Sequence, residues 1–253
     1  MALPLGILAF LLAIANLALF VSWQYPAVPG FSNHPFDCWD GAINLRANYR
    51  LFVPAAYGAD NAKRWPIVVF LHGSGGRGND LNKLGYRGLL KEVRANPDFP
   101  FILVAPQCPS NQFWSAEVLN SLLDEVTRNL RVDTNRIYLT GLSMGGYGAW
   151  ELAIQHPERF AAIVPICGGG DTNEVLRADA QQRQALRRLP VRAYHGAKDQ
   201  TVKLEESEQM VAALRSIGCT NVSLTIYPEA KHDAWSATYS NPELYEWLAK
   251  QHR

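Results

Sequence analysis

The chain has 253 residues, of which 48% are hydrophobic and 19% are charged, and its formal net charge is +1. This composition indicates a globular protein with one sizeable core, and one domain is the default expectation. The near-neutral charge gives no electrostatic reason to expect nucleic acid or an acidic polymer as a partner.

The N-terminal segment is apolar. Residues 2–23 contain no charged side chain and are long enough to cross a bilayer as a helix. We expect a signal peptide or a membrane anchor there, which implies a periplasmic, extracellular or membrane-tethered protein; a buried core helix is the alternative. Residues 24–36 are rich in proline and are expected to be a linker, and residues 37–253 are expected to form the main domain.

The four cysteines, Cys38, Cys108, Cys167 and Cys219, lack the C-x-x-C spacing that is typical of a structural zinc site. Export would permit disulfides among them, in any of three pairings. Cys108 and Cys167 each follow an expected strand, so they are candidates to lie at the same edge of a sheet. Free buried thiols are the alternative.

Apolar runs alternate with helical patterns along the rest of the chain. Period-two alternation over residues 48–54 predicts an antiparallel edge strand. Buried strands are expected at 66–71, 101–105, 136–140, 161–166, 191–196 and 221–227. Helices are expected at 116–130, 147–155, 204–216 and 242–251, with one or two surface helices within 171–189. This order predicts an α/β protein whose mostly parallel sheet carries helices on both faces.

A glycine-rich loop, residues 72–78, follows the strand expected at 66–71 and contains the pattern G-x-G-x-x-G. A dinucleotide site would also need a helix that opens on the last glycine and an acidic residue at the end of the next strand, and neither is present. A P-loop is excluded because no Gly-Lys-Ser/Thr follows. The loop fits an oxyanion hole better, because glycines let the backbone turn an N–H group toward a substrate carbonyl. The amide of Ser74 is the expected donor.

Residues 141–145, Gly-Leu-Ser-Met-Gly, spell G-x-S-x-G between an expected strand and an expected helix. This is the setting of a nucleophile elbow, with Ser143 at a sharp turn. A Cβ two residues before or after Ser143 would clash in such a turn, so glycine belongs at Gly141 and Gly145. The start of the following helix favours negative charge, and the amide of Met144 is the second expected oxyanion donor.

A reactive serine needs a base, and the base needs a third group that holds its tautomer. Asp199 and His232 each lie in a loop after an expected strand, in the chain order Ser, Asp, His. Loops at the carboxyl ends of parallel strands share one edge of the sheet. We therefore predict Ser143 as the nucleophile, His232 as the base and Asp199 as the acid. Asp233 is a rival acid, but its side chain would point away from the adjacent His232.

Two further interpretations concern residues near the same edge. Trp114 and Trp235 are candidates to shape a substrate pocket, and ordinary packing is the alternative for each. A metal site formed by His195, Asp199, His232 and Asp233 is a further possibility. No H-E-x-x-H or comparable ligand spacing supports such a site. Neither a metal nor a cofactor is therefore expected.

Taken together, these motifs resemble the α/β-hydrolase superfamily. More closely they resemble small single-domain serine esterases related to the catalytic domain of prolyl oligopeptidases and to feruloyl and polyhydroxybutyrate esterases. The residues that carry the resemblance are 71–76, 141–148, 157–160, 195–199, His232 and 234–235, within a span of about residues 40 to 250.

The resemblance implies an α/β-hydrolase fold for residues 37–253, with the elbow after the central strand. It implies a serine hydrolase that cleaves small or medium carboxylic esters through an acyl-enzyme, with the triad and the oxyanion amides assigned above. A serine peptidase of the prolyl-oligopeptidase type is the alternative. A non-catalytic binding protein on this fold usually lacks one triad member, and none is missing here.

Overall fold

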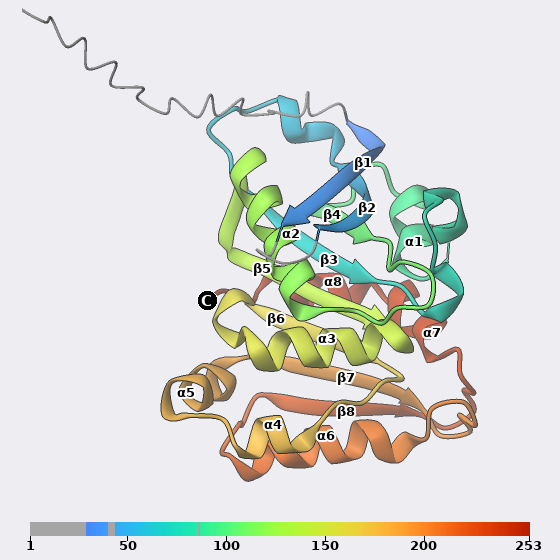
Figure 1. The fold of residues 1–253 in the computed structure, drawn as a ribbon, viewed down its shortest axis with the longest axis vertical. Coiled ribbons are helices and arrows are strands. Elements are labelled where there is room, and N and C mark those ends of the chain that lie inside the picture. Colours follow the sequence, from blue (N-terminus) through green and yellow to red (C-terminus); the bar gives the residue numbers. More distant parts are fainter. Residues whose placement is uncertain (1–28, 40–43, 86) are drawn as a thin grey trace, which may run out of the picture.

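The computed structural model describes residues 29–39, 44–85 and 87–253. Eight strands form one sheet in the order β1-β2-β4-β3-β5-β6-β7-β8. The first two strands, β1 (Gly30–Trp39) and β2 (Asn44–Val53), are antiparallel to their neighbours. The other six run parallel to one another: β3 (Trp65–Leu71), β4 (Ile102–Pro106), β5 (Val132–Leu142), β6 (Ala162–Ile166), β7 (Val191–Gly196) and β8 (Val222–Tyr227). The mostly parallel sheet confirms the predicted fold class (Figure 1).

Helices cover both faces of the sheet (Figure 1). One face carries α2 (Ala116–Asn129), α3 (Met144–Gln155), α4 (Thr172–Leu176), α5 (Ala180–Arg188) and α6 (Leu204–Ser216). The other face carries α1 (Leu89–Ala95), α7 (Ala234–Ser240) and α8 (Pro242–Ala249). Each layer buries its own hydrophobic cluster against the sheet.

Strand β3 shows how one sheet serves two cores. All of its residues are buried. Ile67, Val69 and Leu71 belong to one hydrophobic cluster, and Val68 and Phe70 belong to the other. Successive side chains of a strand point to opposite faces, so a strand between two helix layers must be apolar throughout.

The expected elements are found with small shifts at their ends, and the segment 171–189 contains two helices, α4 and α5. The short helices α1 and α7 were not predicted. The described part of the chain also contains four short 3-10 helices: Ala55–Gly58, Ser74–Gly76, Leu81–Leu84 and Pro157–Arg159.

Strand β1 corrects two expectations. It pairs with β2 along its whole length, so β1 and not β2 lies at the edge, and residues 30–36 of the expected linker belong to the sheet. Proline and glycine suggested a linker, but an edge strand tolerates Pro35 because one side of its backbone needs no ladder partner. The expected signal or anchor segment, residues 2–23, lies outside the described residues. Within the described ranges, no helix has both the length and the apolar character needed to span a membrane.

Three cysteines are free thiols. Cys108, Cys167 and Cys219 are buried and unpaired with one another, so the alternative of free buried thiols is confirmed for these three. The side chain of Cys38 lies outside the described residues.

Candidate active site

Ser143 lies in a strained turn between β5 and α3. Its φ is 54° and its ψ is −121°, a conformation that residues with a Cβ rarely adopt. A Cβ on Gly141 would lie 2.0 Å from the Gly145 carbonyl oxygen, and a Cβ on Gly145 would lie 2.0 Å from that of Leu71. Both contacts are far inside van der Waals range, which gives the physical reason for the two glycines of the predicted elbow.

The structure brings the predicted base to Ser143. His232 follows β8, and its Nε2 lies 2.8 Å from Ser143 Oγ. Its Nδ1 lies 2.7 Å from Asp199 Oδ2. Because an ionised carboxylate only accepts hydrogen bonds, Nδ1 carries the proton, and the free Nε2 of the neutral ring faces the hydroxyl.

Asp199 follows β7 and is held by its own loop. Oδ1 accepts hydrogen bonds from the amides of Thr201 and Val202, at 2.9 and 3.0 Å. Burial raises the pKa of Asp199, but the hydrogen bonds from His232, Val202 and Thr201 outweigh burial, so the pKa lies below its ordinary value. Asp233 instead precedes α7 at its N-cap position, and the hydrogen-bonded partner of His232 is Asp199.

The two expected oxyanion donors lie beside Ser143. Ser74 is the first residue of the 3-10 helix after β3, and Met144 is the first residue of α3. The first N–H groups of a helix have no partner within it, so they are available to a ligand. Ser74, Ser143 and Met144 line one cleft.

His72 supports the glycine-rich loop, a role that sequence reasoning missed. Its Nδ1 donates to the Gly73 carbonyl at 2.6 Å, and its Nε2 accepts from the Cys108 amide at 3.0 Å. Its own carbonyl accepts from Trp114 Nε1 at 3.2 Å. Burial lowers the pKa of His72 to about 4, despite the bond to Gly73. The ring is therefore neutral at pH 7.

We expect His72 to make stability depend on pH. In the unfolded chain His72 takes a proton near the ordinary histidine pKa of 6.5, whereas in the folded chain its pKa is about 4. The contribution of His72 is complete above 6.5 and is lost as the pH falls toward 4, by about 3 kcal/mol in order of magnitude. In His72→Gln, an oxygen replaces the accepting nitrogen and does not titrate.

Urea unfolding at pH 7 and pH 4.5 measures this effect. The free energy of unfolding should fall more steeply for wild type than for His72→Gln, while the control His156→Gln, at the end of α3, should follow wild type. Parallel curves for wild type and His72→Gln would contradict the assignment.

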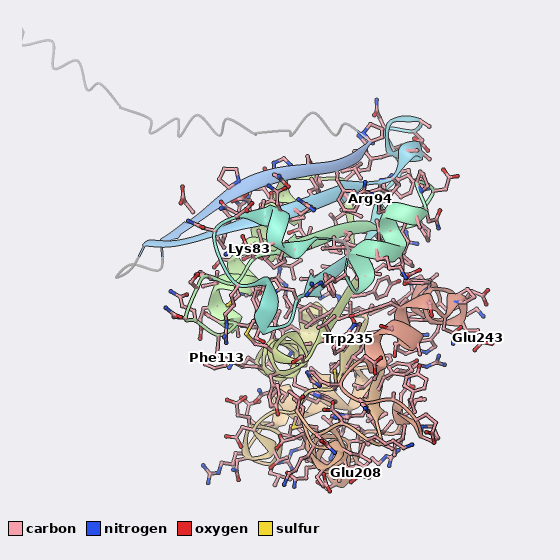
Figure 2. The ribbon with its side chains drawn as sticks, turned by 90° about the vertical axis from the view of Figure 1, so that its right-hand side faces the viewer. Lys83, Arg94, Phe113, Glu208, Trp235 and Glu243 are labelled. Atoms are coloured by element: carbon pink, nitrogen blue, oxygen red, sulfur yellow. The ribbon has the colours of Figure 1, made fainter. Side chains whose placement is uncertain are left out.

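Two clefts meet at Ser143. One, of about 190 Å³, includes Trp235 and His232, and its other lining residues include Lys83, Arg87, Leu84 and Phe70. The other, of about 520 Å³, includes Trp114 and Phe113, and its other lining residues include Arg77, Tyr147, Glu151 and Val202. Figure 2 faces the side on which Lys83, Phe113 and Trp235 lie. Ser143 can thus place the two halves of a substrate in separate clefts.

The two expected pocket tryptophans differ. Trp235 is half-buried and its ring meets that of His232 edge to face at 5.3 Å. Trp114 is 8% exposed, and its Nε1 donates a hydrogen bond to the His72 carbonyl. It therefore lines the cleft and also packs against the glycine-rich loop. Sequence reasoning missed Phe113, which is 77% exposed with the Arg77 guanidinium 4.7 Å from its ring centre. The adjacent Trp114 is the only clue in the sequence, and it says nothing about exposure.

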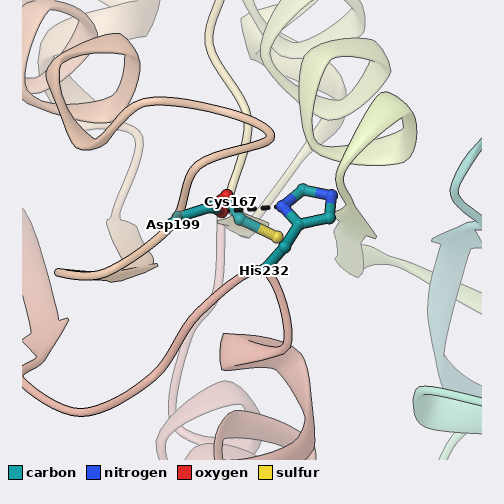
Figure 3. Close-up of side chains that lie close together, drawn as sticks. All are labelled: Cys167, Asp199 and His232. Carbon is teal, nitrogen blue, oxygen red and sulfur yellow. Dashed lines mark hydrogen bonds and ion pairs between the residues drawn. The ribbon is translucent and has the colours of Figure 1, made fainter.

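A buried thiol completes this region. Cys167 Sγ, Asp199 and His232 offer ligand atoms within 4.8 Å of one another (Figure 3). The 2.7 Å separation between Asp199 Oδ2 and His232 Nδ1 is a hydrogen bond; two ligands of one tetrahedral Zn²⁺ at about 2.0 Å would lie roughly 3.3 Å apart. Burial raises the pKa of Cys167 to about 12, so the thiol is neutral. The arrangement therefore fits a triad with a neighbouring thiol.

Comparisons with known proteins agree with this geometry. The family model described as phospholipase/carboxylesterase matches residues 110–247, more than half of the chain, including Ser143, Asp199 and His232. Among solved structures, a thermostable esterase has a TM-score of 0.73 and 33% identity, over 87% of this chain and 63% of that chain.

Two curated relatives match shorter segments. NocK of Nocardia uniformis subsp. tsuyamanensis, which is named an esterase, is 28% identical over 118 residues, 41% of this chain and 33% of its own length. The bifunctional acetylxylan esterase/xylanase XynS20E of Neocallimastix patriciarum is 26% identical over 132 residues, 51% of this chain and 17% of its own. The matches thus span a third or less of the length of these two relatives.

Proposed function

The chain belongs to the phospholipase/carboxylesterase family, and from this premise we propose that it hydrolyses carboxylic esters through an acyl-enzyme on Ser143. The observation that carries the proposal is the hydrogen-bonded row Ser143–His232–Asp199, with contacts of 2.8 and 2.7 Å, at the meeting point of two clefts. Esterases among its relatives support the same chemistry.

Acylation follows from the contacts around Ser143. Oγ attacks the ester carbonyl carbon while His232 Nε2 takes its proton. Asp199 holds the ring and stabilises the resulting imidazolium. The carbonyl oxygen becomes an oxyanion and accepts from the amides of Ser74 and Met144; in enzymes of this kind one such donor is worth about 3 to 4 kcal/mol.

Collapse of this intermediate breaks the bond between the acyl carbon and the alkoxy oxygen. His232 gives its proton to the leaving alcohol, and the acyl group stays on Ser143. Water then enters, gives a proton to His232 and attacks the acyl carbon. The second collapse returns that proton to Ser143 Oγ and releases the carboxylic acid, so every atom and proton is accounted for.

A matched ester and anilide test this proposal. Both carry the same acyl group and a nitroaromatic leaving group, so they differ in the protonation that the departing atom requires. We expect turnover of the 4-nitrophenyl ester, with the 4-nitroanilide at or near the background rate. Comparable kcat/KM values for the two substrates would favour the serine peptidase. If neither substrate is turned over and a fluorophosphonate does not label the chain, the protein is a binding protein.

We also propose that residues 2–23 direct export or tether the protein to a membrane. The support is that these residues are mostly apolar and include no charged side chain. Cells that express the full chain should yield activity in an exported or membrane fraction, and a chain without residues 1–23 should leave it in the cytoplasm. If the activity is distributed in the same way between the fractions for both chains, residues 2–23 do not direct export or tethering.

A further inference from the structure

A second histidine lies against the proposed catalytic acid. His195 is the next-to-last residue of β7, is 0% exposed, and takes no part in the proposed reaction. Its Nε2 lies 3.4 Å from Asp199 Oδ2 and 3.0 Å from the Val202 carbonyl oxygen. Its Nδ1 lies 2.8 Å from Ser207 Oγ. Asp199 is therefore between two histidines, with His232 on the side of the cleft and His195 on the buried side.

The hydrogens available for these contacts can be counted. The Val202 carbonyl only accepts, so His195 Nε2 must carry a proton. Ser207 Oγ donates to the Gly168 carbonyl at 2.8 Å, which uses its single hydrogen. Nδ1 must then donate to Ser207 Oγ. Only a ring that is protonated on both nitrogens satisfies all three contacts, because a neutral ring leaves one buried contact without a hydrogen.

The charge count agrees with this protonation. The Asp199 side chain is 0% exposed, and it accepts hydrogen bonds from His232, Thr201 and Val202, as an ionised carboxylate does. A buried carboxylate is costly unless an opposite charge lies near it. A positive His195 at 3.4 Å supplies that charge.

We propose that His195 is a doubly protonated second partner of Asp199, which positions the carboxylate and its loop and limits the basicity of His232. The catalytic part of this proposal rests on the proposed function, whereas the protonation of His195 does not depend on that function. His195 touches no substrate and acts through Asp199. A fixed positive charge behind the carboxylate disfavours a second positive charge on His232, so removal of that charge should raise the affinity of His232 for a proton.

The other titratable groups around this cluster either stay neutral near pH 7 or are left in place by the variants described below. Burial raises the pKa of Tyr147 on α3 and of Cys167 after β6 to about 12 in each case, so both stay neutral. Three further charged residues lie near the cluster: Glu206 on α6, Lys198 in the loop after β7 and Asp233 in the loop before α7. Lys198 forms an ion pair with Glu229.

Nitrogen-15 NMR of the histidine rings in the full chain tests the protonation state directly, with His195→Gln to identify the His195 signals. We expect both ring nitrogens of His195 to carry protons at pH 7. In Ser207→Ala, where Nδ1 loses its acceptor, the proton on Nδ1 should be lost at a lower pH than in wild type. A wild-type His195 with one bare ring nitrogen at pH 7 would overturn the proposal.

The pH profile of kcat/KM tests the coupling to His232. In His195→Gln and in Ser207→Ala, the acidic limb should move to higher pH by about half a unit or more. The control Ser236→Ala, an exposed residue of α7, should leave it in place. If kcat falls while the limb stays where it is in wild type, His195 is only structural and the coupling is wrong. Absence of ester turnover by wild type would instead defeat the proposed function, and the NMR result would still decide the protonation of His195.

Discussion

Ser143→Ala should lower kcat/KM for a short-chain 4-nitrophenyl ester by at least about 10³-fold. The substitution removes the hydroxyl oxygen that His232 Nε2 contacts at 2.8 Å on the cleft side, so no acyl-enzyme can form. The fold should survive, because alanine can occupy the same turn and the loss of one oxygen leaves the packing in place. Steady-state kinetics with circular dichroism as a check on folding measure the effect.

The matched control is Ser236→Ala, which removes an exposed hydroxyl from the helix that follows His232. Its kcat/KM should equal that of wild type. A Ser143→Ala protein that is folded and retains wild-type turnover would show that another residue is the nucleophile.

Gly145→Ala should damage stability and activity together. The new Cβ would lie 2.0 Å from the Leu71 carbonyl oxygen and 2.8 Å from that of His72. Backbone cannot rotate away as a side chain can, so α3 and the end of β3 must separate. We expect a loss of about 3 kcal/mol or more in the free energy of unfolding, at the upper end for an overpacked core. Because Leu71 and His72 directly precede Gly73 and Ser74 of the glycine-rich loop, and the Ser74 amide is an expected oxyanion donor, kcat should fall as well.

Gly75→Ala is the control for this prediction, because a Cβ on Gly75 has no atom within 4 Å among the described residues. Urea unfolding of the two variants compares a crowded glycine with an open one near the same site. Equal stabilities would mean that the elbow is not as close to β3 as the structure has it.

The nucleophile, base and acid candidates were predictable because each follows an apolar run of β type. Ser143 follows β5, Asp199 follows β7 and His232 follows β8, and parallel strands present their carboxyl ends at one edge. Local sequence was therefore enough to predict that these three side chains would meet. His232 is 89 residues from Ser143 and 33 residues from Asp199 along the chain.

Other features depend on contacts that local sequence does not encode. Strand β1 is a strand because β2 lies beside it, and its proline and glycine suggested a linker. His72 is neutral because the fold buries it, and Phe113 matters because it is exposed. His195 was considered as a metal ligand and as part of the motif at 195–199, and its contact with the carboxylate was not predicted because its hydrogen bonds come from a loop and a helix that follow it.

The central claim is that Ser143 carries the acyl group during turnover. The most direct test is to treat the wild-type chain with a fluorophosphonate, which phosphonylates an activated serine, and to locate the adduct by peptide mass spectrometry. We predict one adduct per chain, on Ser143, that is absent from Ser143→Ala and from chain denatured before treatment. An adduct on a different residue, or an unmodified Ser143 in protein that hydrolyses the ester, would contradict the account.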